Sequence, residues 1–130
     1  MYKPFIITAL LLGALAVILG AFGAHGLKAY ANEQILSTFE TAVKYQFFHV
    51  FALAFTGVLY KEYPIKGILL AGRLFIIGIC FFSGSLYLLT LFSITGNTQF
   101  NWIGAITPIG GLLLISGWVF LAVKIASYKR

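Results

Sequence analysis

The residue types best suited to chemistry in this sequence are its two histidines, His25 and His49, which lie at the end of one apolar segment and inside the next. Tyr45 lies one helical turn before His49 and shares its face, Gln46 borders that face, and Glu40 lies further upstream. If the two imidazoles converge, this set could bind a metal, a haem edge, a quinone headgroup or a proton. A plain interhelical hydrogen bond that fixes helix register is the simpler interpretation.

A metal site would depend on His25 and His49 with one distant glutamate. Structural zinc takes four protein ligands and catalytic zinc three, so this ligand set is thin and we predict no cofactor. Cys80 is the single cysteine of the chain, which leaves no second thiol for a disulfide or a metal. We expect it to behave as a small apolar side chain.

Hydroxyl groups form a second polar step at Ser83, Ser85 and Tyr87, which can hydrogen-bond across helices or back to their own backbone. We count these three with the histidine set as candidate ligand-binding residues. No catalytic signature accompanies them. The chain has no aspartate, which rules out a Ser-His-Asp triad, and it has no phosphate-binding glycine loop with a lysine. The sequence therefore gives no sign of an enzyme.

The elements that must position these residues are apolar. Hydrophobic residues make up 61% of the chain and charged residues 9%, whereas a soluble domain carries about 25% charged residues. This amount of charge is too small to cover a surface that faces water. Most of the exterior must therefore face lipid. We predict an all-α membrane protein, one membrane domain over 1–130, folded as an antiparallel bundle of four transmembrane helices. The expected helices cover residues 5–24, 33–60, 67–92 and 102–123.

The second of these helices is too long for a simple span. Asn32 looks like its N-cap, with Glu33 and Gln34 in the first turn. The charge of this helix falls in residues 33–44. We therefore expect that half to project into the outer interface or lie along it, leaving residues 45–60 as the buried part.

Charge also predicts orientation. Seven cations fall on the side of the termini and two on the other side, and cations gather on the cytoplasmic flank of membrane spans. The first group is Lys3, Lys61, Lys66, Arg73, Lys124, Lys129 and Arg130, and the second is Lys28 and Lys44. This places both termini in the cytoplasm and both histidines in the outer leaflet. The cations form no stripe on a wetted face, so we do not expect a nucleic acid partner.

Small residues indicate where helices pack closely, because membrane helices associate through such residues. A stripe runs along the first helix at Ala9, Gly13, Ala16, Gly20 and Ala24. It could be a homodimer seam, although packing within the chain is the simpler interpretation. Pro108 is expected to kink the fourth helix near the backbone oxygen of Gly104. Gly23, Gly26 and Gly111 are further expected packing positions.

Four blocks of sequence also carry a resemblance. They are Gly20–Leu27 (GAFGAHGL), Thr41–Gln46 (TAVKYQ) with His49, Phe82–Tyr87 (FSGSLY), and Thr107–Gly111 (TPIGG) with Gly117 and Trp118. In this order they resemble the small inner-membrane proteins of the YgdD/YwdK type, a domain of unknown function that is related to a small eukaryotic transmembrane protein family. The resemblance spans nearly the whole chain. It implies a multi-pass protein of the bacterial inner membrane and no known activity.

Our leading hypothesis from the sequence is a non-enzymatic membrane protein that binds a small molecule or a lipid headgroup at an outer-leaflet polar site. One alternative is an assembly subunit that packs through the small-residue face of the first helix, with a second copy or another membrane protein as its partner. The other is a metal- or haem-binding redox protein.

Overall fold

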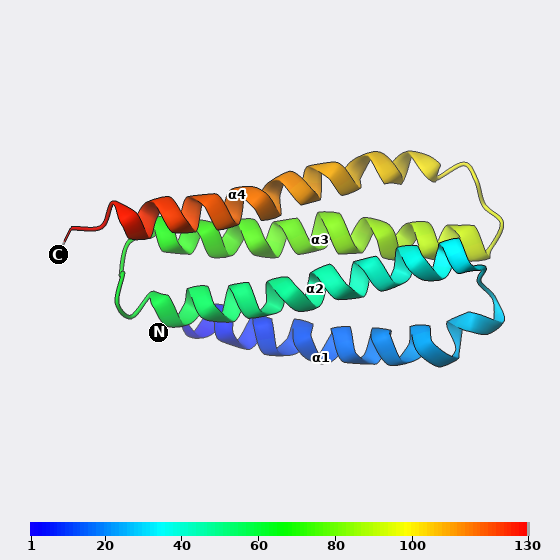
Figure 1. The fold of residues 1–130 in the computed structure, drawn as a ribbon, viewed down its shortest axis with the longest axis horizontal. Helices are drawn as coiled ribbons and strands as arrows, with labels where there is room; N and C mark the ends of the chain where they lie inside the picture. Colours follow the sequence, from blue (N-terminus) through cyan, green and yellow to red (C-terminus); the bar gives the residue numbers. More distant parts are fainter. Residues whose placement is uncertain (130) are drawn as a thin grey trace.

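Four long helices lie side by side in the computed structural model, which describes residues 1–129 (Figure 1). The helices are α1 (Lys3–His25), α2 (Glu33–Leu59), α3 (Lys66–Ile94) and α4 (Ile106–Ala126). Short 3₁₀ turns, η1 (Leu27–Ala29) and η2 (Asn101–Ala105), occupy two of the connections. All four helical segments are long and apolar enough to cross a membrane, which confirms that part of the sequence prediction.

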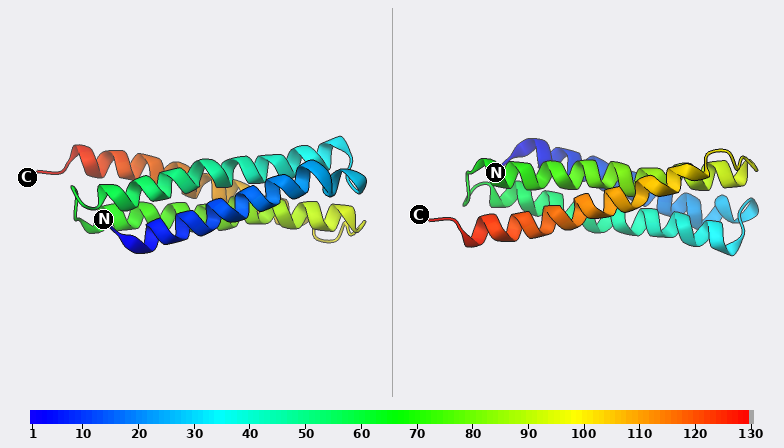
Figure 2. Two further views of the ribbon diagram at one scale, coloured as in Figure 1. Left: turned by 90° about the horizontal axis from the view of Figure 1, so that it is seen from below. Right: turned by 90° about the horizontal axis from the view of Figure 1, so that it is seen from above.

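The order of the helices in space follows their order in the chain. The main contacts join α1 to α2, α2 to α3 and α3 to α4, and two further views show α1 and α4 on opposite sides of the α2–α3 pair (Figure 2). The chain reverses direction at each connection, so the N- and C-terminal ends lie at the same end of the molecule (Figure 1).

Helix ends are set by local chemistry. The Asn32 side chain accepts a hydrogen bond from the backbone N–H of Ile35 at 2.9 Å, which confirms the predicted N-cap of α2. At the end of α3, Gly96 adopts a left-handed φ of +70°. The N–H of Asn97 then donates to the Phe92 carbonyl and the N–H of Gly96 to the Ser93 carbonyl. These two bonds form a Schellman cap that closes the helix at a residue type suited to positive φ.

Two apolar clusters hold the helices together. The larger surrounds the fully buried ring of Phe75 between α3 and α4, with Ile68, Ala71, Ile79, Leu114 and Leu121. The smaller lies between α1 and α2 and contains Phe5, Ala9, Val50 and Leu53. In a bilayer such contacts stabilise through close packing, because lipid tails are as apolar as these side chains.

The structure adds to two sequence expectations about helix shape. The first half of α2 packs within the bundle, because Phe39 and Ala42 are buried against the neighbouring helices and only the outward side of this half carries charge. Its position in the outer interface stays a prediction. Pro108 does not kink a continuous helix, because α4 begins at Ile106 and Pro108 is its third residue. A backbone N–H at position 108 would be in the first turn of α4 and would have no carbonyl partner within the helix. Proline, which lacks this N–H, is therefore tolerated.

Candidate functional site

Gln46 is the centre of the buried polar groups. Its side chain is 2% exposed. Its amide nitrogen donates to the backbone oxygen of Leu12 on α1 at 2.8 Å, and its amide oxygen accepts from the Tyr87 hydroxyl on α3 at 2.7 Å. One side chain therefore links three helices, and both ends of its amide are satisfied without a ligand.

His49 is held as firmly as Gln46. Its Nδ1 lies 2.7 Å from the Tyr45 carbonyl oxygen, and because a carbonyl only accepts, Nδ1 carries the proton. Its Nε2 then accepts from the indole N–H of Trp118 on α4 at 3.1 Å. Both ring nitrogens of this neutral imidazole are engaged, so a metal could bind His49 only by displacing Trp118.

The serine hydroxyls predicted as ligand-binding groups also bind protein. Ser83 donates to the Ala42 carbonyl on α2 at 2.7 Å, and Ser85 shares a 2.6 Å hydrogen bond with Thr107 on α4. Across residues 1–129, every buried side-chain nitrogen and oxygen has a hydrogen-bond partner. The predicted Gln46, His49, Ser83, Ser85 and Tyr87 thus each take part in a hydrogen bond to another helix.

The two histidines do not converge. Gly13 of α1 lies against Val50 of α2, since a Cβ at Gly13 would be 3.3 Å from the valine side chain. His49 is therefore level with Gly13, and His25 is twelve positions further along α1, about 18 Å away at the rise of a helix. His25 is exposed at the end of α1. The expectation that His25 and His49 lie at the same depth is wrong, because α1 and α2 lie side by side along their whole length.

No metal cluster replaces that pair. In the part of the chain that the structure describes, no three His, Cys, Asp or Glu side chains gather at a common point. Glu40 is exposed on the outer side of α2, away from His49.

A groove opens beside His49 between α2 and α4. It has a volume of about 430 Å³ and is lined by Tyr45, His49, Phe82, Gly111, Leu114, Ile115 and Trp118. The Tyr45 ring packs against Phe82 at 4.8 Å between centroids, and Tyr45 and Trp118 are 41% and 46% exposed. No residue among 1–129 hydrogen-bonds the Tyr45 hydroxyl, which makes it the free polar group of this groove.

Trp118 and Phe82 were not among the predicted site residues. A signal for Trp118 was present, because an indole N–H inside a span needs an acceptor and His49 was an available one. Their pairing joins residues 69 positions apart, which a single sequence does not reveal. Phe82 carries no comparable signal.

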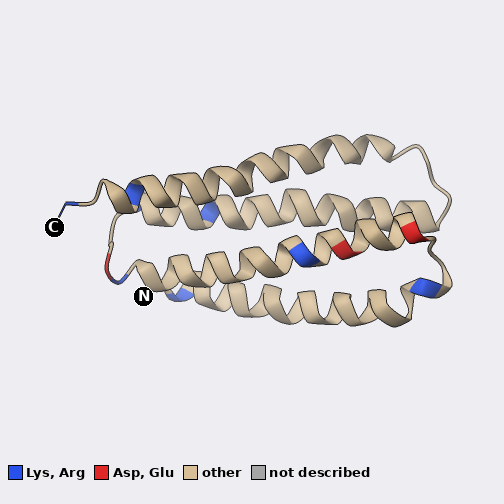
Figure 3. Cartoon of the chain, viewed as in Figure 1, with Lys and Arg blue, Asp and Glu red and all other residues tan. Residues whose placement is uncertain are grey.

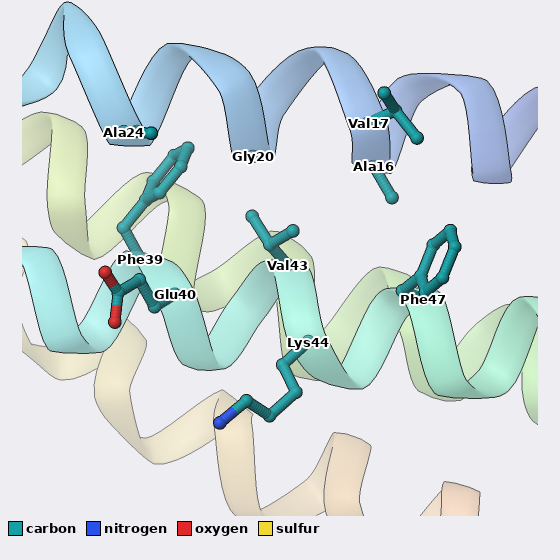
Figure 4. Close-up of a pocket in the computed structure, with 10 residues that line it drawn as sticks. Ala16, Val17, Gly20, Ala24, Phe39, Glu40, Val43, Lys44 and Phe47 are labelled. Carbon is teal, nitrogen blue, oxygen red and sulfur yellow. The ribbon is translucent and has the colours of Figure 1, made fainter.

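The small-residue stripe of α1 faces α2 within the chain. Figure 4 shows Phe39 and Val43 pointing toward α1, opposite Ala24 and Gly20, whereas Lys44 points away from it. A shallow groove of about 350 Å³ remains along this seam. The stripe is thus occupied largely by in-chain packing, with Ala9 and Ala16 each only 1% exposed.

The predicted packing glycines differ in how tightly they are enclosed. A Cβ at Gly23 would lie 2.7 Å from the Phe39 ring, and one at Gly20 would lie 3.5 Å from Val43. A Cβ at Gly26 would meet only Phe22 of the preceding helix, and one at Gly111 would be in ordinary contact with the Phe82 ring at 3.7 Å. At Gly110, α4 approaches α3 so closely that a Cβ would overlap the Phe82 backbone.

Comparison with known proteins gives a consistent assignment. The family described as protein of unknown function (DUF423) matches residues 19–111. The chain is 46% identical over 127 residues to a UPF0382 membrane protein of Staphylococcus aureus, covering 98% of this chain and 97% of the relative. It is 39% identical over 127 residues to the UPF0382 membrane protein YwdK of Bacillus subtilis, covering 97% and 98%. No solved structure matches.

Proposed function

Since the chain belongs to the DUF423 family of membrane proteins, we propose that it is a non-enzymatic protein of the bacterial inner membrane that binds a lipid-like amphiphile from the bilayer. The groove between α2 and α4 is the proposed site. Tyr45 donates to a polar group of the ligand, and the apolar wall holds its tail.

The Tyr45 hydroxyl carries this proposal. Tyrosine side chains in membrane proteins favour the interface, where the hydroxyl meets water and headgroups. Tyr45 is instead the thirteenth of the 27 residues of α2, close to the helix midpoint. A hydroxyl at that depth without a partner costs free energy, because hydrocarbon offers none. A ligand carbonyl, ester or hydroxyl oxygen that accepts from Tyr45 would remove that cost.

The walls of the groove fit the remainder of such a ligand. Phe82, Leu114 and Ile115 are apolar, and Gly111 leaves space because the nearest atoms to a Cβ there are 3.7 and 3.8 Å away. His49 lies at the groove with both nitrogens already bonded, so it shapes the site and does not supply a free donor. This arrangement supports binding and offers no group for bond-making chemistry.

Charge supports the orientation that places both termini in the cytoplasm. Most lysine and arginine positions lie toward the end of the bundle that holds the termini (Figure 3). In the described chain these are Lys3, Lys61, Lys66, Arg73, Lys124 and Lys129. If this end is cytoplasmic, as the positive-inside rule favours, the α1–α2 and α3–α4 connections lie on the outer side of the membrane.

Native mass spectrometry of the protein released from nanodiscs made with bacterial lipid extract tests the site. We expect the parent to retain an amphiphile adduct, and Gly111→Leu to lose it because the leucine fills the groove. Gly84→Leu is the matched control, because Gly84 also has open space around it and does not line this groove. Tyr45→Phe should retain the adduct several-fold less well, as expected when one hydrogen bond of about 1 kcal/mol is removed.

Equal adducts on the parent, Gly111→Leu and Tyr45→Phe would refute the proposal. So would a parent that carries no adduct at all. Loss of the adduct from Gly84→Leu as strongly as from Gly111→Leu would also refute it, since the effect would then not belong to this groove.

A further inference from the structure

The outward face of α2 differs from the lipid-facing sides of the other helices. It is defined by the exposed residues Glu33, Ser37, Glu40, Lys44, Phe48, Phe51, Phe55 and Val58, which follow one another at helical spacings of three or four. The exposed faces of α1 and α4 are built from aliphatic and aromatic side chains such as Leu10, Leu11, Leu112 and Val119. Of the four helices, only α2 contains charged residues of both signs, and they lie in its first half (Figure 3).

Two of its charges lie deep when α2 is centred in the bilayer. A helix of 27 residues is about 40 Å long, and the hydrocarbon core is about 30 Å thick. Lys44 is the twelfth residue of α2, so its backbone is well inside the core when the helix spans the bilayer. Glu40 lies one turn nearer the outer end. A charged side chain at such a depth is costly unless it is paired or wetted.

The two side chains lie one turn apart on the same helix face but are not paired in the structure. Neither Glu40 nor Lys44 forms an ion pair or a hydrogen bond with any residue in 1–129. Both residues border the groove along the seam with α1, and the Lys44 side chain is directed away from α1 (Figure 4). The face therefore calls for a partner that brings a cation to Glu40 and an anion to Lys44 at the same depth.

We propose that this partner is a second copy of the chain, bound through the outward face of α2. Around a two-fold axis along the membrane normal, the two α2 helices are parallel and the contact is reciprocal. Lys44 of each copy then reaches up one turn, about 6 Å, to Glu40 of the other. The axis brings equivalent residues to the same height, so this one-turn lean is what pairs each charge with an opposite one, and the pairs are shielded from lipid.

The rest of the face suits the same contact. Phe48, Phe51 and Phe55 are 56%, 61% and 53% exposed and continue the face beyond the charged pair. The seam groove beside Glu40 and Phe47 is lined by Ala16, Gly20 and Ala24, which leave about 350 Å³ for rings of the second copy. The apolar half supplies packing, and the charged half selects register and orientation.

Charge-swap variants test the proposal in liposomes, with donor and acceptor fluorophores attached to the C-termini of separate full-length copies and energy transfer measured as lipid is added. The parent should show transfer that persists on dilution. Glu40→Lys and Lys44→Glu should each self-associate about tenfold or more weakly, because like charges then face one another. A mixture of the two single variants should recover transfer, and so should the double variant.

Recovery in the mixture is the decisive observation, because neither single variant can form the contact alone and a folding defect would not be repaired by mixing. The double variant keeps the parent's net charge and covers the case in which a single variant fails to insert. Lys28→Glu, an equal charge change outside α2, is the control and should associate like the parent.

The proposal would be overturned if energy transfer between parent copies were no greater than that expected from random proximity in the membrane. Failure of both the mixture and the double variant to recover would do the same. If the variants associate like the parent and instead change the amount of charged phospholipid that remains bound, a headgroup covers this face and a second copy does not.

Discussion

The hydroxyl of Tyr87 on α3 donates to the side-chain oxygen of Gln46 on α2, 2.7 Å away and 41 positions apart in the chain. The same amide donates to α1 through Leu12. The three helices can slide past one another only if these bonds break, and the apolar surroundings offer no replacement partner. This contact fixes the relative height of α1, α2 and α3.

Removing either end of this contact should weaken the bundle. Tyr87→Phe and Gln46→Leu are each expected to lower the free energy of unfolding by about 0.5–2 kcal/mol, the range for buried interhelical hydrogen bonds in membranes. Unfolding by sodium dodecyl sulfate in mixed micelles, followed by circular dichroism, measures it. Tyr30→Phe is the matched control because Tyr30 is 74% exposed.

The double variant separates a direct contact from two independent effects. If the Tyr87 hydroxyl acts through Gln46, combining Tyr87→Phe with Gln46→Leu should cost less than the sum of the two single changes. Strict additivity would show that the 2.7 Å contact contributes nothing as a pair.

Adding one methyl group at Gly110 should separate α3 from α4. A Cβ there overlaps the backbone of Phe82, which cannot rotate aside as a side chain could. We expect Gly110→Ala to lower the free energy of unfolding by about 1–3 kcal/mol, the cost of overpacking a close contact. The same detergent unfolding measures it.

Gly84→Ala provides the comparison, because nothing lies within 4 Å of the added carbon. It should leave stability unchanged or raise it slightly, since alanine favours helix more than glycine. Equal losses in Gly84→Ala and Gly110→Ala would contradict the close approach of α4 to Phe82.

The two histidines should behave differently. His25→Ala is expected to change the free energy of unfolding by less than about 0.5 kcal/mol, because His25 is exposed and its side chain makes no hydrogen bond or ring contact with residues 1–129. His49→Ala removes the acceptor for the Trp118 indole and leaves a cavity beside Phe75, so it should cost about 1–3 kcal/mol. Equal effects would indicate that His49 does not hold α2 to α4.

Membrane orientation can be read from single cysteines placed in a Cys80→Ala background. Gln99→Cys, in the connection between α3 and α4, should react with a membrane-impermeant maleimide on intact spheroplasts. Ser127→Cys, in the C-terminal tail, should react only after lysis. The reverse pattern would contradict cytoplasmic termini, and labelling of both positions in intact cells would indicate a mixed population.

Much of the fold was predictable because it depends on local composition. Four apolar segments of span length, and an asparagine ahead of Glu33, are visible in the sequence, and the structure has the helices and the Asn32 cap. The packing of residues 33–44 against the bundle was not foreseen, because charge on one face of α2 was taken to describe the whole helix. Phe39 and Ala42 on the opposite face determine where this half packs.

The candidate site was less predictable, because its geometry depends on the register between helices. Tyr45 and His49 were identified, but their partners Phe82 and Trp118 are brought to them by α3 and α4. The supposed approach of His25 to His49 failed for the same reason. It assumed that α2 enters the bundle at residue 45, whereas the pairing of Gly23 with Phe39 shows that it enters a dozen residues earlier, at Glu33.

The neighbour-to-neighbour order of the helices has a consequence for biosynthesis. Each helix finds its main packing partner in the one made immediately before or after it. The α1–α2 hairpin can therefore close its glycine seam as soon as α2 has left the ribosome and entered the bilayer. Gln46 and His49 of this hairpin then remain without their partners on α3 and α4 until those helices are synthesised and inserted.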